Sequence, residues 1–342
     1  MSELEQFEPE GEAEGGVSRR GLLSGGLLAA AGAGLLGPAA AAAAKATRDA
    51  TLPIAGNKVK VGMVTHGDAG SFWSVAKKGA VKAGSDLGVQ VLYSESNNDP
   101  KKQADLINTA ISKGITGLAV SAPNPDALKS PLKKAADKGI PIVTLNSGSD
   151  VFKQLGAFTH VGQTENIAGA GAGAKLKEAG LKKLLVIIHE QSNIGLEQRY
   201  SGAKSKFGST VRLQVAGTND ISTTTTQIQT KLAADHSIDA VLALNPDIAA
   251  AALDAKKKAH SKAKIATFDL SGDVVSAIAD GDILFAVDQQ QYVQGYLPVV
   301  LLYLYDINLN TTGGGLPVLT GPGFVDKSNA SKVAALAKSG TR

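Results

Sequence analysis

Short runs of apolar and β-branched residues alternate with helix-forming stretches along the chain from residue 58 onward. The runs are KVKVGMV, VQVLY, GLAVS and IPIVTL, then LLVIIH, VRLQVAG, DAVLAL, AKIATF and ILFAV, with a tenth near LPVL. Between them lie stretches such as KKQADLINTAISKG. Strands that alternate with helices form parallel sheets covered by helices, so the pattern predicts an α/β fold.

The number of strands and a break in the pattern predict two sheets rather than one. Ten strands are many for one small sheet, and the alternation restarts after FTHVGQTENIAG. A chain of 342 residues is long enough for two domains, each with its own core. We therefore expect two doubly wound parallel-sheet lobes. In such sheets ligands bind beyond the carboxyl ends of the strands.

The N-terminal segment has the layout of an export signal. Ser18, Arg19 and Arg20 precede a Leu/Ala/Gly-rich run that ends in several small residues. This is the arrangement of a twin-arginine signal peptide, which we assign to residues 1–44, with cleavage between about Ala42 and Ala46. The alternative is an uncleaved membrane anchor, which the many Gly and Ala residues of the run disfavour. The expected location is therefore the periplasm or cell envelope.

Composition excludes several kinds of chemistry. With no cysteine, the chain has no disulfide, no thiolate metal site, no cysteine nucleophile and no lipid-modified cysteine. Its five histidines are dispersed and form no zinc motif, so we expect no metal and no cofactor. The net charge of +4 comes with lysines scattered over predicted helices, without interleaved aromatic residues, so we expect no nucleic-acid partner.

One glycine-rich run imitates a dinucleotide-binding motif. GAGAGA at residues 169–174 fits G-x-G-x-x-A, but the helix that contains it already begins near TENIAG. A phosphate binds at a helix N-terminus and could not reach backbone amides inside the helix. We therefore interpret the run as a site of close helix–sheet packing.

Polar side chains follow nearly every predicted strand. The first half carries THGDAGSFW, SAPNPD and NSGSD in these loops, and the second half carries HEQSNIGLEQRY, GTNDIS, NPD, DLSGD and DQQQYVQGY. Asn, Asp, Gln, Ser and Arg hydrogen-bond the neighbouring hydroxyls of a sugar, and Arg199 can grip two oxygens at once. Others only form turns and helix caps, the role we assign to Asp126, Ser222 and Asp247.

Phe72 and Trp73 lie side by side in the first of these loops, at the start of a predicted helix. Core packing is the usual role of an aromatic pair. Adjacent residues point about 100° apart on a helix, however, so one buried stripe does not easily hold both. The apolar C–H face of a sugar ring stacks on an aromatic plane, and the polar loops around the pair favour this role.

The order of these motifs resembles the periplasmic ribose-type sugar-binding proteins that feed ABC importers. The resemblance covers about residues 58–320 and rests on VGMVTHGDAGSFWSVAKKGA, IPIVTLNSGSD, LEQRYSGAKSKF and IATFDLSGDVVSAIADGDILFAVDQQQYVQGY, among others. It implies a type I periplasmic binding protein, with a hinge of three chain crossings near 160–164, 286–290 and 319–321. Lobe 1 is then 58–161 plus 291–318, and lobe 2 is 162–290 plus 319–342.

The resemblance also implies the ligand-binding residues. The ring-stacking pair falls on Phe72 and Trp73, and the polar contacts fall on Ser121, Arg199, Asn219, Asn245, Asp269 and Gln289. Glu190 is added as a ligand contact because it follows a strand near the cleft. Many relatives have Asp-Arg where this chain has Asn146 and Ser147. The loss of a charge-assisted grip there favours a longer or more reduced ligand, such as a polyol, over ribose.

The function implied is the delivery of a simple sugar or polyol to the membrane permease of an ABC importer. We expect a monomer whose two lobes close over the ligand, and no enzymatic activity. Two alternatives stay open: a ligand-sensing protein for a chemoreceptor or sensor kinase, and a periplasmic carbohydrate enzyme. The enzyme requires paired carboxylates that face one bond, and the sequence places none clearly opposite Asp269.

Overall fold

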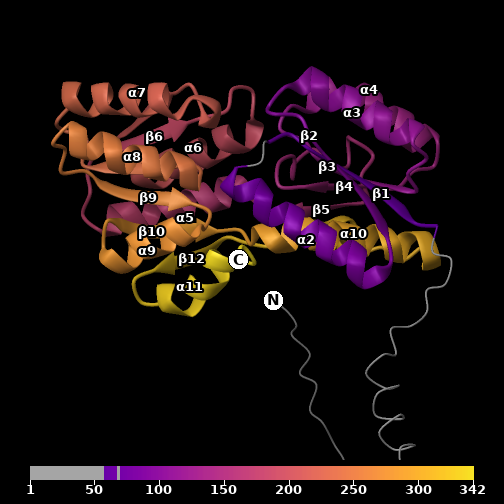
Figure 1. Ribbon diagram of the computed structural model, residues 1–342. Coiled ribbons are helices and arrows are strands. Elements are labelled where there is room, and N and C mark those ends of the chain that lie inside the picture. Colours follow the sequence, from indigo (N-terminus) through magenta and orange to yellow (C-terminus); the bar gives the residue numbers. More distant parts are fainter. Residues whose placement is uncertain (1–57, 68–69) are drawn as a thin grey trace, which may run out of the picture. The chain divides into compact units, whose positions relative to one another are not determined.

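The computed structural model describes residues 58–67 and 70–342, so the twin-arginine assignment lies outside the described residues. The described residues belong to one compact unit, Ile54–Arg342, with two six-stranded sheets covered by helices on both faces (Figure 1). This confirms the expected α/β class and the pair of doubly wound lobes.

The first sheet has the strand order β11-β5-β4-β3-β1-β2, and all its pairings are parallel. Its strands are β1 (Lys60–Thr65), β2 (Gln90–Glu95), β3 (Gly117–Ser121), β4 (Ile142–Leu145), β5 (Thr159–Gly162) and β11 (Val318–Leu319). One face is covered by α2 (Ser71–Leu87) and α10 (Gln291–Asn308), the other by α3 (Pro100–Ser112) and α4 (Pro125–Asp137).

The second sheet has the order β12-β10-β9-β8-β6-β7, and only β12 runs antiparallel to its neighbour. Its strands are β6 (Leu184–Ile188), β7 (Thr210–Gln214), β8 (Ala240–Ala243), β9 (Lys264–Phe268), β10 (Ile283–Asp288) and β12 (Gly323–Asp326). One face is covered by α5 (Glu165–Glu178) and α6 (Ile194–Phe207), the other by α7 (Ile221–Ala234), α8 (Pro246–Lys258), α9 (Gly272–Asp280) and α11 (Ala330–Ser339).

The chain passes between the two sheets three times. It leaves the first sheet after β5, returns to it from β10 through α10, and leaves it again after β11 to form β12. The first lobe is therefore built from two separate stretches of sequence, and so is the second. Loops at the carboxyl ends of both sheets are brought to the boundary between the lobes.

The glycine-rich run lies inside α5 and packs against both the sheet and a helix: a Cβ at Gly171 would lie 2.9 Å from the ring of Phe324 on β12. A Cβ at Gly169 would lie 2.1 Å from the carbonyl oxygen of Arg199, and one at Gly173 would lie 2.4 Å from that of Ala203. Gly202 of α6 approaches α5 equally closely. The interpretation as helix–sheet packing therefore holds at Gly171 but misses the contact of Gly169 and Gly173 with α6. The small residues let α5 and α6 touch along their backbones, which brings Arg199 against the start of α5.

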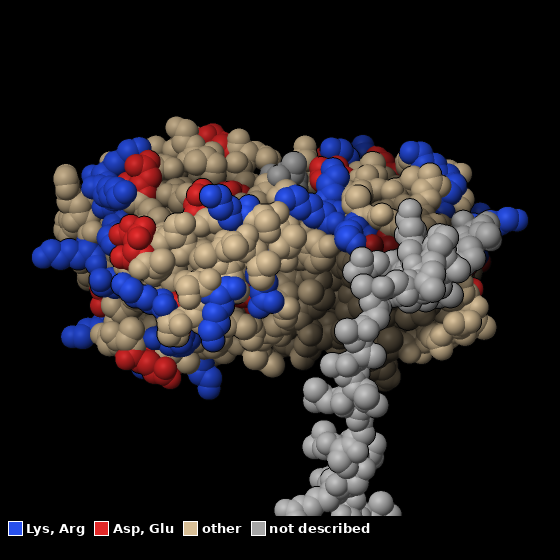
Figure 2. All heavy atoms as spheres, turned by 60° about the horizontal axis from the view of Figure 1, so that its bottom comes forward, with Lys and Arg blue, Asp and Glu red and all other residues tan. Residues whose placement is uncertain are grey.

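Charged side chains on the surface are mixed in sign. On the face shown in Figure 2, lysine and arginine side chains lie scattered between acidic ones and do not form a continuous stripe. Within residues 58–67 and 70–342, no helix is both long and apolar enough to cross a membrane.

Candidate functional site

A cavity of about 340 Å³ lies between the lobes, beyond the carboxyl ends of the strands. Loops and helix starts of both lobes line it, and Gln289 comes from the crossing after β10. The lining residues are His66, Phe72, Trp73, Asn146, Ser147, His189, Glu190, Asn193, Gly195, Arg199, Leu244, Asn245, Asp269 and Gln289. The cavity thus has aromatic side chains on the side of the first lobe and polar side chains from both lobes.

Hydrogen bonds join the lobes around this cavity. Ser71 Oγ donates to Asp247 Oδ1 at 2.6 Å, and Gln198 Nε2 donates to Asp150 Oδ2 at 2.7 Å. The backbone N–H of Ile194 donates to the carbonyl oxygen of Pro123, in a loop of the first lobe, at 3.1 Å. The assignment of Asp247 to a helix cap was therefore wrong, because its carboxylate bridges the two lobes. The structure has the lobes closed over the cavity.

Phe72 and Trp73 combine the two roles weighed for them. Both are only 5 % exposed and belong to the apolar core beneath α2 and α10, yet both also line the cavity. Their rings meet edge to face with centroids 4.8 Å apart, and the Trp73 ring meets the His66 ring in the same way at 4.9 Å. Packing on two sides fixes the rings as a rigid apolar wall.

Ser121 lies behind this wall and does not line the cavity. Its Oγ accepts the backbone N–H of His66 at 2.8 Å and lies 2.7 Å from His66 Nδ1. Because the hydroxyl already accepts one hydrogen bond, its own proton can donate to Nδ1, which leaves the ring proton on Nε2. That nitrogen faces Glu190 Oε2 at 3.5 Å, across the boundary between the lobes. Ser121 therefore orients a lining residue that the sequence interpretation missed.

Arg199 is held by an acidic residue that the sequence interpretation also missed. Its Nε and Nη2 donate to the two carboxylate oxygens of Glu165 at 2.6 and 2.8 Å, and its Nη1 donates to the carbonyl of Leu244 at 3.1 Å. Arg199 is 4 % exposed and Glu165 1 %. The planar fork is thus committed largely to Glu165, so Arg199 presents a fixed positive charge beside the cavity rather than a free bidentate grip.

Asp269 lies in a strongly desolvated position at the end of β9. Burial raises the pKa of its carboxyl to about 7, against the opposing effects of the Arg199 charge and of the hydrogen bond from Gln289 Nε2, which measures 2.7 Å. Gln289 Oε1 also accepts a long hydrogen bond from Asn146 Nδ2 at 3.5 Å. A hydrogen bond from a ligand hydroxyl to this carboxyl group favours its ionised form, because hydrogen bonds to the charged form stabilise that form.

His189, which is buried, and Asn245, which is partly exposed, keep part of their hydrogen-bonding capacity free for a ligand. Burial lowers the pKa of His189, so its ring is neutral, and within the described chain its buried Nδ1 has no hydrogen-bond partner. Asn245 uses Oδ1 to cap α8, at 2.7 Å from the backbone N of Asp247, which leaves its Nδ2 for other partners. Unpaired buried polar atoms in a cavity favour a polar ligand.

Not all of the ten expected ligand residues line the cavity. Eight line the cavity: Phe72, Trp73, Asn146, Glu190, Arg199, Asn245, Asp269 and Gln289. Ser121 lies behind His66, and Asn219 is exposed in a short 3-10 turn (Thr218–Asp220) and does not line it. His66 and Asn193 line it without having been expected. Both follow strands in loops rich in polar residues, which was the available signal.

Comparison with known proteins adds the family. A model of the periplasmic binding protein domain matches residues 61–306, well over half of the chain. The chain belongs to this family. The ribose import binding protein of Haemophilus influenzae is 28% identical to this periplasmic binding protein over 251 residues, which are 67% of this chain and 79% of the relative. The xylitol-binding protein of Mycolicibacterium smegmatis is 23% identical over 268 residues, 76% and 74% of the two chains.

Solved structures show the same fold. A carbohydrate transporter from Acidothermus cellulolyticus 11B, crystallised in complex with myo-inositol, is 42% identical with a TM-score of 0.81, over 83% of this periplasmic binding protein and 99% of that chain. A solute binding protein of an ABC transporter from Mycobacterium smegmatis, with bound glycerol, is 22% identical with a TM-score of 0.72, over 81% and 96% of the two chains. The second likeness concerns the fold alone.

Proposed function

We propose that this protein binds a neutral cyclic polyol of the myo-inositol class and delivers it to the membrane permease of an ABC importer. The observation that carries the proposal is the cavity between the lobes, with an aromatic wall on one side and hydrogen-bonding groups from both lobes on the other. Such a lining suits a ring with an apolar C–H face and many hydroxyls. The 42% identical transporter solved with myo-inositol supports the same class.

The polar groups divide into acceptors and donors that hydroxyls can satisfy. Asp269 and Glu190 accept hydrogen bonds, Asn245 Nδ2 donates, and the amide of Asn146 offers one acceptor and one donor group. The ligand would bridge both lobes and favour the closed form. The protein acts in this proposal as a monomeric carrier and not as an enzyme.

Calorimetry with a panel of ligands tests the ligand class. We expect myo-inositol to bind more tightly than ribose by at least about ten-fold, because Asn146 and Ser147 replace the charged pair that suits a compact ribose. Asn146→Asp is expected to narrow this difference. Trp73→Ala should weaken every ring-shaped ligand by roughly 1–3 kcal/mol through lost stacking and burial. Tighter binding of ribose than of any polyol by the wild type contradicts the proposal.

We also propose export through the twin-arginine route, on the basis of Arg19 and Arg20 and the run that follows them. Changing both to lysine keeps the charge and removes the arginine pair. The double variant is expected to stay in the cytoplasm at its unprocessed length, as measured by cell fractionation and immunoblotting. A single Arg→Lys variant serves as the control for expression. Normal secretion of the double variant rules out this route.

A further inference from the structure

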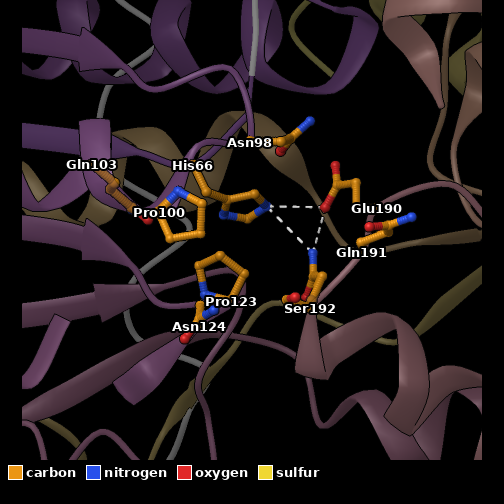
Figure 3. A pocket seen from close by; sticks show the side chains of 10 residues that line it. His66, Asn98, Pro100, Gln103, Pro123, Asn124, Glu190, Gln191 and Ser192 are labelled. Atoms are coloured by element: carbon orange, nitrogen blue, oxygen red, sulfur yellow. Dashed lines mark hydrogen bonds and ion pairs between the residues drawn. The ribbon is translucent and has the colours of Figure 1, made fainter. Parts of the chain in front are cut away.

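A second pocket of about 260 Å³ adjoins the ligand cavity at the boundary between the lobes (Figure 3). We call it the outer pocket. It shares His66, Glu190 and Asn193 with the ligand cavity, so these three side chains separate the two spaces, and we call them the dividing wall. Its other lining residues are Asn98, Pro100, Gln103, Pro123, Asn124, Gln191 and Ser192.

The dividing wall is held across the lobes by contacts of His66 and by a hydrogen bond from Ser147 Oγ to Asn193 Oδ1 at 3.3 Å. His66 Nε2 lies 3.5 Å from Glu190 Oε2 and also 3.5 Å from Asn193 Nδ2 (Figure 3). The short hydrogen bond in the dividing wall, from Asn193 Nδ2 to Glu190 Oε2 at 2.5 Å, lies within the second lobe. Hydrogen bonds weaken steeply at such long distances. A ligand group that passes between the two spaces would therefore have to separate His66 from Glu190, which are joined only by a contact of 3.5 Å.

The rim of the outer pocket has an unusual backbone. Asn97, Asn98 and Ser192 have φ values of 55°, 61° and 62°, in the left-handed region that residues other than glycine rarely adopt. The first two are held there by hydrogen bonds from their backbone N–H groups to Gly67 and His66 carbonyls, at 3.2 and 2.6 Å. Such conformations cost free energy and gather at ligand-binding and active sites.

One polar group of the outer pocket lacks a partner. Asn98 Oδ1 is buried, and no described residue donates a hydrogen bond to it. A buried acceptor without a donor is costly, and an entering hydroxyl would supply the donor. Pro100 and Pro123 flank His66 and offer apolar C–H surface beside the polar groups (Figure 3).

The charge of the outer pocket restricts what can enter. Its lining includes the Glu190 carboxylate and no lysine or arginine. Burial raises the pKa of Glu190, but the contacts of its carboxylate with His66 and Asn193 outweigh this effect and hold the pKa below its ordinary value, so the carboxylate is ionised at neutral pH. An anionic group such as a phosphate is therefore repelled, whereas a neutral hydroxylated group is accepted.

We propose that the outer pocket is a second subsite, which holds a neutral hydroxylated substituent, such as a second sugar ring, attached to the ring in the ligand cavity. This inference rests on the proposed function, because it extends the ligand of that same cavity. The natural ligands would then include glycosylated cyclic polyols. Asn98 lines the outer pocket and not the ligand cavity, so its side chain would contact the substituent alone.

Calorimetry with myo-inositol and galactosyl-myo-inositol tests the subsite, with Asn98→Gly and Asn97→Gly as matched variants. Glycine tolerates the left-handed backbone at both positions, so neither variant adds strain. The wild type is expected to bind galactosyl-myo-inositol at least as tightly as myo-inositol. Asn98→Gly should lower the affinity for galactosyl-myo-inositol, relative to that for myo-inositol, about five-fold. Asn97→Gly, at an exposed position, should leave this relative affinity unchanged. Myo-inositol 1-phosphate should bind more weakly than either.

The outcomes separate the two proposals. Binding of myo-inositol without binding of galactosyl-myo-inositol overturns the subsite and leaves the proposed function standing. An equal loss of both affinities in Asn98→Gly also overturns the subsite, since Asn98 would then act on the cavity as a whole. If no cyclic polyol binds to the wild type, the proposed function fails and the subsite fails with it.

Discussion

Replacing Glu165 by alanine is expected to lower the free energy of unfolding by about 3–5 kcal/mol. The change leaves the Arg199 guanidinium buried without its bidentate partner, in a position only 4 % exposed. Removing one member of a buried ion pair costs far more than the pair contributes, because an uncompensated charge stays in a medium of low dielectric constant. Urea unfolding of the mature protein followed by circular dichroism measures the loss.

The chain offers a matched control in the exposed pair of Arg212 with Glu197. Glu197→Ala breaks an Arg–Glu pair of similar geometry in solvent and should cost less than about 1 kcal/mol. The double variant Glu165→Leu with Arg199→Met removes both buried charges and should recover much of the stability lost in Glu165→Ala, although not ligand binding. A Glu165→Ala variant no less stable than Glu197→Ala contradicts the importance of the buried pair.

Asp269→Asn is expected to make the protein more stable at pH 8 while weakening ligand binding. The pKa of this carboxyl is about 7 in the folded protein, because burial disfavours the charge, and about 4 in an unfolded chain. A raised pKa favours folding fully below pH 4, and this contribution is lost as the pH rises through 7. The difference corresponds to up to about 4 kcal/mol at pH 8, which the neutral asparagine recovers.

The measurement is thermal or urea unfolding of both proteins at pH 4 and pH 8. The gain in stability should be present at pH 8 and absent at pH 4, and Asp273→Asn, at an exposed position of the neighbouring helix, should show neither. Calorimetry should show that the wild type binds its polyol more tightly at pH 8 than at pH 6, since the carboxylate accepts hydroxyl protons, and that Asp269→Asn loses this dependence. Equal stability of the two proteins at pH 8 is the contrary result.

The sequence predicted the strands that lie in apolar runs, and it did not predict two strands with few apolar residues. The ten runs identified as strands match strands of the structure, but β5 and β12 were missed. β5 reads THVG and β12 reads GFVD, so each contains glycine and polar residues and only one or two apolar ones. Both are stabilised by pairing with strands far away in the sequence or across a crossing, which no local pattern shows.

The sequence indicated which loops line the cavity, but not which side chains pair with one another there. Most expected residues follow strands, and parallel sheets bring those loops together. Glu165 looks in the sequence like an ordinary acidic residue at a helix N-terminus, a favourable position for any carboxylate. Its pairing with Arg199 requires the close approach of α5 and α6, which depends on where Gly169 and Gly202 meet the facing helix. Asp247 was likewise misjudged because its partner, Ser71, belongs to the other lobe.

The return of the chain to its first sheet has a consequence for the order of folding. α10 supplies Val299, Leu301 and Leu302 to the core that also contains Phe72 and Trp73. A nascent chain that ends before residue 291 therefore leaves uncovered the part of α2 that packs against α10, however complete the loops of that lobe already are. Contacts between residues so far apart in sequence form slowly. The core that supports the aromatic wall of the cavity is thus completed late, after most strands of the second sheet have been synthesised.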